Sequence, residues 1–413
     1  MHKAAFVLGL AACAGHERTI EVTAMRGDQP EPGAIAIAHH ANGERFADVH
    51  VDADGHAAVR VDDGDLVTLV YPAVDPVDVF GTHLFTIAPT GDIIVHGPPL
   101  PGGGSLPSLG TLDVSPIGNV DADAYNVESS CGWNWANTFP KTFEIDAGCI
   151  GRDGQVPVIV TAYKQGQPIA YVAGLAALAN GSGTFAPTTW LPYVPNVPIV
   201  TTGVTPHLEW TLSSDGVRVG PGDEIAGAAL VPDGLPIDGA AIRAWIEGPG
   251  GSAQAVSRAV SGAPSQITLG PDDFLPQVPA TLVASGLPIQ GDPTARLRFT
   301  WAQSDIGADV AALSLAWISR TGQSVSWTAV LPPDARGLDC LPFEGELDGL
   351  APESDPSLAL VYIDSPDLHG YADVLSAGIA AQPLDVSAPI VPPPTAGELR
   401  TSWTGYGPQS PQP

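Results

Sequence analysis

The chain has 413 residues and carries 16 Lys and Arg against 45 Asp and Glu, a formal charge of −29. That balance excludes a nucleic acid partner, because a phosphate backbone is bound by a basic surface. Hydrophobic residues make up 44% of the chain, too large a share for an intrinsically disordered protein. The 47 glycines and 42 prolines interrupt helices and favour short strands joined by turns. We therefore expect an all-β chain of several domains.

The N-terminus has the pattern of a secretory signal. Lys3 supplies a positive charge, residues 4–10 form a short apolar run, and small residues follow that run. The run is too short to cross a bilayer as a helix, which takes about 20 residues. We expect a signal peptide rather than a membrane span.

The tetrapeptide Leu-Ala-Ala-Cys at residues 10–13 resembles the lipobox of bacterial lipoproteins. The resemblance implies that residues 1–12 are removed and that Cys13 carries the acyl chains, palmitate among them, as the first residue of the mature protein. Ala14 stands where an aspartate would imply inner-membrane retention, so the resemblance implies an extracytoplasmic protein tethered by lipid to the outer membrane. The alternative is an ordinary apolar N-terminus with an incidental cysteine.

Residues 13–96 are expected to form a first β-sandwich domain. Strand-like alternation covers residues 45–52, 56–61 and 65–71, and the intervening turns end in Gly55 and Gly64. Three-residue loops that end in glycine suit hairpins, so we predict that residues 45–52 pair with residues 56–61.

The predicted pairing of residues 45–52 with 56–61 sets four polar side chains and an arginine on one face. Asp48 would face Arg60, Asp52 would face His56, and His50 would lie beside them. Mixed nitrogen and oxygen groups of this kind can ligate a metal, which makes His50, Asp52 and His56 candidate ligands. We expect no metal and instead a solvated strand face with an Asp–His contact and an Asp–Arg pair.

Residues 19–71 also resemble carboxypeptidase regulatory-like, transthyretin-like β-sandwich domains. The resemblance rests on a Gly-x-x-Pro start at Gly27, a Gly-Ala pair at Gly33 and an Asp-x-Asp-Gly turn at Asp52. It implies a non-catalytic spacer or binding unit.

The rest of the chain is divided by composition. A Pro- and Gly-rich linker covers residues 97–110, and a loose Pro-rich tail covers residues 391–413. Between them we expect a second β-sandwich domain over 111–215 and a third β-rich domain over 216–390. The fold class is thus tandem β-sandwiches, immunoglobulin-like or transthyretin-like, after a signal peptide.

The second domain contains the two cysteines that we expect to pair. Cys131 and Cys149 occur in strand-like alternating runs, each at the apolar parity, so both thiols should face one interior. We predict a disulfide between them, which agrees with an oxidising compartment, and a free, buried Cys340. The alternative is two reduced, buried thiols.

Trp133 and Trp135 share the parity of Cys131 and are expected in the core, with a platform for sugars or peptides as the alternative.

Further elements follow the same patterns. A hairpin is predicted between residues 156–163 and 168–172, and a short helix over residues 171–179. Alternating apolar residues at 313–317 predict a strand, and the nearly continuous apolar run at 357–364 predicts a buried strand.

No motif in the sequence indicates a reaction. It has no Gly-x-Ser-x-Gly, no His-Glu-x-x-His, no phosphate-binding glycine loop and no Cys-x-x-Cys. We therefore expect no catalytic residue and no cofactor, and a non-enzymatic envelope lipoprotein that serves as a binding or structural module. Its expected partners are the membrane, through the lipid anchor, and a protein or a glycan. Two alternatives stay open: an extracytoplasmic hydrolase without a recognisable motif, and a metal-binding lipoprotein that uses the first-domain histidines.

Overall fold

The computed structural model shows an all-β protein. It describes residues 17–26, 29–73, 81–97, 108–116, 120–225, 227–248, 252–278, 282–285, 297–302, 307–353, 356–376, 379–381, 390–391 and 398–406. In this part of the chain α1 (Tyr371–Ser376) is the only α-helix, and no helix is long and apolar enough to span a membrane. The predicted fold class is confirmed at the level of an all-β chain with several sheets.

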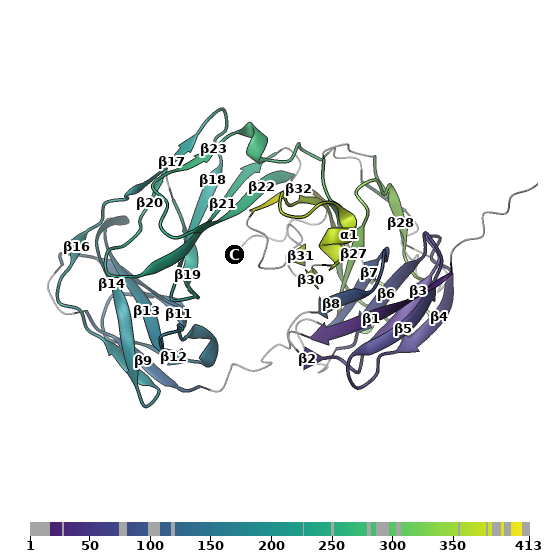
Figure 1. Cartoon of the computed structure of the whole chain (residues 1–413), viewed down its shortest axis with the longest axis horizontal. Helices are drawn as coiled ribbons and strands as arrows, with labels where there is room; N and C mark the ends of the chain where they lie inside the picture. Colours follow the sequence, from purple (N-terminus) through teal and green to yellow (C-terminus); the bar gives the residue numbers. More distant parts are fainter. Residues whose placement is uncertain are drawn as a thin grey trace, which may run out of the picture.

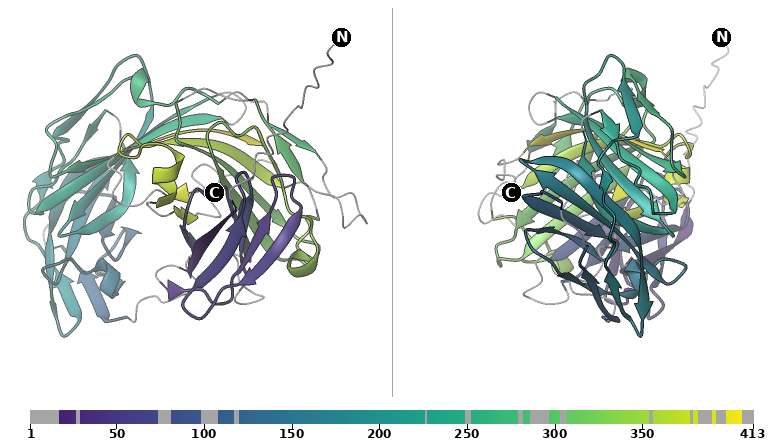
Figure 2. Two further views of the ribbon diagram at one scale, coloured as in Figure 1. Left: turned by 45° about the vertical axis from the view of Figure 1, so that its right-hand side comes forward. Right: turned by 90° about the vertical axis from the view of Figure 1, so that its left-hand side faces the viewer.

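The strands form an arch (Figure 1). Strands between residues 110 and 201 gather at one end, and strands between residues 18 and 97 gather at the other. A long sheet joins the two ends, as the views in Figure 2 also show.

This joining sheet has 12 described strands and includes segments far apart in sequence. In spatial order they are β19 (Val217–Glu224), β18 (His207–Ser214), β21 (Ile237–Glu247), β22 (Ala253–Ser261), β32 (Glu398–Tyr406), β29 (Ser357–Asp364), β26 (Val310–Ile318), β27 (Ser324–Leu331), β7 (Thr82–Ile87), β6 (Leu66–Tyr71), β3 (Ile35–His39) and β4 (Arg45–His50). The contact between β27 and β7 is parallel, whereas its other strand pairs are antiparallel.

Two further sheets pack with it. One consists of β2 (Gln29–Pro30), β1 (Arg18–Arg26), β8 (Ile93–Gly97), β30 (Ile379–Ala381), β31 (Ile390–Val391) and β5 (His56–Val61), which pairs with β1. The other has three strands, β24 (Val283–Ser285), β25 (Arg298–Thr300) and β28 (Gly337–Asp339).

The opposite end of the arch has its own sheets. The larger consists of β11 (Gly132–Ala136), β10 (Ala124–Ser129), β13 (Gln155–Lys164), β14 (Gln167–Ala179), β15 (Ser182–Phe185), β9 (Gly110–Val114) and β12 (Lys141–Ile145), with β16 (Leu191–Pro192) paired to β14. The smaller consists of β20 (Ala228–Ala229), β17 (Val197–Thr201) and β23 (Ile267–Leu269).

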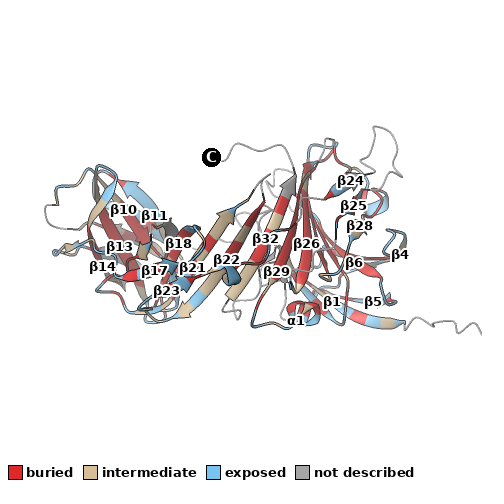
Figure 3. Cartoon of the chain, turned by 90° about the horizontal axis from the view of Figure 1, so that it is seen from above, coloured by how far each residue is buried: buried red, intermediate tan, exposed pale blue. Residues whose placement is uncertain are grey.

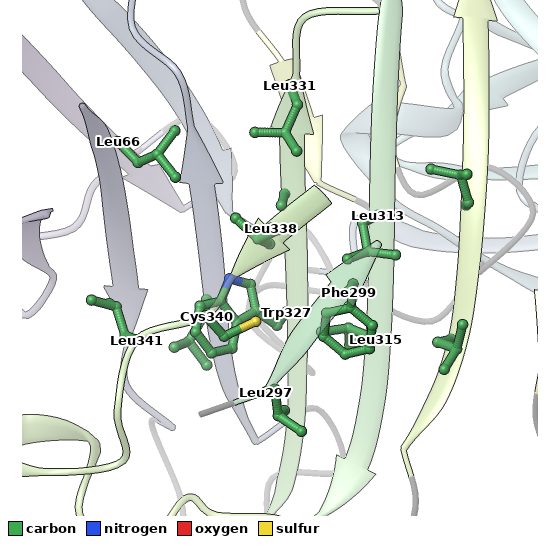
Figure 4. Close-up of a cluster of buried hydrophobic side chains, with 14 of the residues drawn as sticks. Leu66, Leu297, Phe299, Leu313, Leu315, Trp327, Leu331, Leu338, Cys340 and Leu341 are labelled. Carbon is green, nitrogen blue, oxygen red and sulfur yellow. The ribbon is translucent and has the colours of Figure 1, made fainter. Parts of the chain in front are cut away.

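Strands β26 and β29 are covered on both faces. One face packs into a core with β1, β5 and α1, and the other packs into a core with β25 and β28 that contains Trp327 and Cys340 (Figure 4). A strand buried on both faces needs apolar residues at consecutive positions, as in the run S-L-A-L-V-Y-I-D of β29. Strand β21 is covered mainly on one face and alternates instead, and the burial colours of Figure 3 show this contrast. The predicted strands at 313–317 and 357–364 are confirmed.

The predicted hairpin pairing in the first domain is wrong. Strand β4 pairs with β3 and strand β5 pairs with β1, so the two predicted partners lie in different sheets. The alternation itself is correct, because Val51, Ala57 and Val59 are buried in one core. The loop also forms as a tight turn, with Gly55 at a φ of 87°. After that turn the chain crosses from one sheet to the other, which buries the apolar sides of both strands between the layers.

The second domain confirms one predicted hairpin and corrects the predicted helix. Strands β13 and β14 pair through a turn in which Gln165 and Gly166 both have positive φ. Residues 171–179 continue β14 as a strand. Its apolar residues face two cores, with Val172 packed on one side and Leu175 on the other, so the segment lacks the one-sided alternation of a surface strand.

Strands of the predicted first and third domains lie in one sheet. Residues of β7 pair with residues of β27, and the predicted boundary at residue 215 falls in the turn between β18 and β19. The prediction of a loose tail is wrong over residues 398–406, which form β32 between β22 and β29, because this segment alternates and completes the sheet. The division of the chain into separate domains stays a prediction.

A line of buried polar side chains crosses the joining sheet. The indole N–H of Trp327 donates to Thr86 at 2.8 Å, and the hydroxyls of Thr86 and Thr68 lie 2.6 Å apart. Thr68 lies 2.9 Å from Nε2 of His39, whose Nδ1 lies 3.1 Å from the carbonyl oxygen of His40. Since a carbonyl only accepts, Nδ1 carries the ring proton, and in the neutral ring Nε2 accepts from Thr68. Each group therefore donates to the next one, in a single direction from the Trp327 indole to the His40 carbonyl oxygen.

Candidate functional site

The predicted disulfide is present. Cys131 and Cys149 are bonded, with their Cα atoms 4.8 Å apart and a sequence separation of 18. The bond ties the turn after β10 to the 3₁₀ helix η1 (Ala147–Cys149), in which the backbone N–H groups of Gly148 and Cys149 donate to the Asp146 carboxylate. The edge strand β11 therefore follows directly from a cross-linked turn. Cys340 is free and buried, as predicted.

The two tryptophans of β11 are exposed, so the prediction that they lie in the core is wrong. Trp133 is 53% exposed and Trp135 is 50% exposed. The reason is the turn: Ser129 pairs with Gly132, which leaves only two residues in the loop. Val127 then pairs with Asn134, so odd positions of β10 share a face with even positions of β11. The tryptophans therefore point to the face opposite the disulfide-containing core.

A third aromatic ring packs beside them. The ring centroids of Trp135 and Tyr163 are 4.9 Å apart, with the ring planes tilted by 57°. Tyr163 comes from β13, on the far side of β10 from β11. We call Trp133, Trp135 and Tyr163 the aromatic platform.

Two buried polar side chains lie directly beside the platform. Asn126 pairs in register with Trp135, and Glu128 pairs with Trp133, so all four side chains share one face. Asn126 is 4% exposed and Glu128 is 9% exposed, and the Asn126 amide donates to the Glu128 carboxylate at 2.7 Å. The Asn126 carbonyl oxygen is buried without a hydrogen-bond partner. Such an acceptor costs free energy unless water or a ligand satisfies it.

The same face continues into a small cavity beneath the β18–β19 hairpin. Glu128 and Thr161 contribute polar groups to its wall, and Trp210 and Tyr193 contribute aromatic ones. The cavity measures about 40 Å³. One water needs roughly 10–15 Å³ by this measure, so the space suits two or three waters and no larger ligand. Among the described residues of its lining, Glu128 supplies the single carboxylate.

A histidine–serine pair lies elsewhere, inside the joining sheet. His83 Nδ1 and Ser326 Oγ are 2.5 Å apart, on directly paired positions of β7 and β27. Both residues are buried, and neither lines the cavity. Catalysis would require a substrate at this pair, and burial keeps its hydroxyl from solvent.

The candidate metal ligands His50, Asp52 and His56 do not converge on one point. Asp52 and His56 bind other groups, and His50 lies in a different sheet. The Asp52 carboxylate accepts the backbone N–H groups of Asp54 and His56, and the bond from His56 holds the pKa of Asp52 below its ordinary value. His56 Nδ1 lies 2.8 Å from Glu21, whereas His50 is on β4 in the other sheet. No three His, Cys, Asp or Glu side chains are grouped as metal ligands in the part of the chain that the structure describes. The predicted Asp48–Arg60 pair is also not formed: Asp48 binds Arg45 and Arg60 faces Glu17.

The predicted lipidation site, Cys13, lies outside the described residues. Sequence reasoning found the disulfide but missed Asn126 and Glu128 as neighbours of the tryptophans. The available signal was the two-residue turn Ser130-Cys131, which reverses the parity between the strands.

Comparisons with known proteins give no assignment. No family model matches the chain, and no curated protein matches it. One solved structure, a product complex of the multi-modular glycogen-degrading pneumococcal virulence factor SpuA, aligns with 88% of this chain at 8% identity and a TM-score of 0.15. The chain spans 38% of that protein's length, and a TM-score this low supports no conclusion about fold or function.

Proposed function

We propose that the protein is a non-enzymatic lipoprotein of the bacterial envelope, tethered to the outer membrane through Cys13, and that its β domains present a binding surface. The observation that carries the binding role is the aromatic platform, with two indole rings half exposed on one strand face. Exposed apolar groups that cluster beside polar ones mark interaction sites more often than isolated ones do.

The location is supported by two independent features. The lipobox-like residues 10–13 provide a site for acylation. The disulfide between Cys131 and Cys149 agrees with folding outside the reducing cytosol.

The test is a fractionation of cells that express wild-type protein or Cys13→Ser. We expect the wild type in the outer-membrane fraction with incorporated palmitate, and the variant in the soluble extracytoplasmic fraction without it. Cys340→Ala serves as the matched cysteine control and should fractionate like the wild type. Palmitate labelling that persists in Cys13→Ser would refute the anchor.

A further inference from the structure

We propose that the aromatic platform binds a neutral oligosaccharide, with one sugar ring over each of Trp133 and Trp135. The proposal rests on the proposed function, because it names the ligand class of that binding surface.

The two indole side chains lie on one strand face and are each about half exposed. Trp133 and Trp135 are two positions apart on β11, which places their side chains on one face and about 6.6–6.8 Å apart along the strand. Neighbouring rings of an extended saccharide can then each lie over one indole. The ring centroids of Trp135 and Tyr163 are 4.9 Å apart, so the two rings are in contact and no cation fits between them. This geometry disfavours the enclosing arrangement that recognises quaternary ammonium groups.

Hydrogen-bonding groups lie where a sugar needs them. Asn126 and Glu128 are directly opposite the two tryptophans, and the Asn126 carbonyl oxygen lacks a partner. The Asn126 oxygen is itself closed to solvent, whereas the Glu128 carboxylate lines the small cavity on this face, where a water can bridge it to a sugar hydroxyl. A ligand with both an apolar ring face and many hydroxyl groups matches this combination of indoles and buried polar groups.

Charge narrows the ligand class further. The chain has a formal charge of −29, and the acidic groups Asp121 and Asp123 lie beside the platform on the turn that precedes β10. Lys164, next to Tyr163, is already paired with Asp121. Anionic saccharides and phosphate groups would be repelled, whereas a neutral saccharide would not.

An extended peptide is the competing ligand, because β11 is an edge strand of its sheet. A peptide that adds to this edge would hydrogen-bond to the β11 backbone and would lie beside the strand. It would leave the half-exposed indole faces of Trp133 and Trp135 unused, so the exposure of these rings favours the saccharide.

The test is isothermal titration calorimetry on the full chain in detergent micelles, with maltohexaose, cellohexaose and xylohexaose as probes. We expect at least one of these hexasaccharides to bind. Trp133→Ala and Trp135→Ala should each weaken its binding about tenfold, which corresponds to the loss of one stacked ring. Trp245→Phe, on a different sheet, is the matched control and should bind like the wild type. Because both platform tryptophans are exposed, their replacement should leave the circular dichroism spectrum unchanged.

Three outcomes would overturn the ligand class: no binding of any neutral hexasaccharide, competition by tetramethylammonium or an extended peptide, or binding that survives both alanine variants. The Cys13→Ser fractionation does not depend on this titration. A chain that is anchored but binds no neutral hexasaccharide therefore refutes the saccharide and leaves the anchored module in place.

Discussion

His39 and His40 are neighbours in sequence, yet the structure shifts their pKa values in opposite directions. Burial lowers the pKa of His39 to about 4, whereas the hydrogen bond from exposed His40 to Asp65 raises the pKa of His40. Protonation of His39 at Nε2 would also place a donor against the Thr68 hydroxyl, which would then have to donate toward Thr86, although Thr86 already accepts from the indole N–H of Trp327.

The protein should lose stability in mild acid through His39. Below pH 6.5 the unfolded chain binds a proton at this residue, and the folded chain excludes it until the pH reaches about 4. The free energy of unfolding should therefore fall by about 3 kcal/mol across that range and then level off. Urea unfolding at several pH values measures this change.

Two variants separate the histidines in that experiment. His39→Gln should flatten the pH dependence between 6.5 and 4, because the amide cannot take up the proton. His40→Gln should not flatten it, because the raised pKa of His40 adds stability below pH 6.5 that is lost as the pH rises through that pKa. An unchanged acid response in His39→Gln would show that another group is responsible.

The disulfide should contribute substantially to stability. It closes a loop of 18 positions, which corresponds to about 3 kcal/mol by restriction of the unfolded chain. The double variant Cys131→Ser, Cys149→Ser should therefore melt at a lower temperature than the wild type. Dithiothreitol should lower the wild-type Tm to a similar value and leave the double variant unaffected; an effect of the reductant on the variant would contradict this account.

Cys340 should be unreactive in the native protein. The residue is fully buried, and this burial raises the pKa of its thiol, so little thiolate forms and reagents cannot reach it. Iodoacetamide should label the wild type at this position only after unfolding in guanidinium chloride. Rapid labelling of the native protein would contradict its place in the core shown in Figure 4.

Gly81 should tolerate no side chain. A Cβ atom at this position would lie 1.8 Å from the carbonyl oxygen of Ser324, and the residue has a φ of 62°. Gly81→Ala must separate β7 from β27 and should cost about 3 kcal/mol or more. Gly64→Ala is the matched control, because its Cβ would meet nothing within 4 Å, and it should cost only about 1–2 kcal/mol from its backbone conformation. Equal Tm values for the two variants would refute the clash.

The sequence by itself determined the local features of this protein. Alternation placed Ala57 and Val59 inward, a continuous apolar run marked β29, and matching parity predicted the Cys131–Cys149 bond. The first two features depend on the two-residue period of a strand, which is encoded within a few neighbouring residues. The disulfide prediction is correct, although Cys131 lies in a turn and Cys149 in η1 rather than in the strands on which the prediction rested.

Only the tertiary structure decided which strands pair and which face the tryptophans occupy. Strand β5 pairs with β1 rather than β4, and β7 pairs with β27, because long-range burial of apolar faces selects partners that sequence distance does not reveal. Parity also does not continue through the two-residue turn between Ser129 and Gly132. For that reason Trp133 lies beside Glu128 on the outer face, where the sequence alone had placed it in the core.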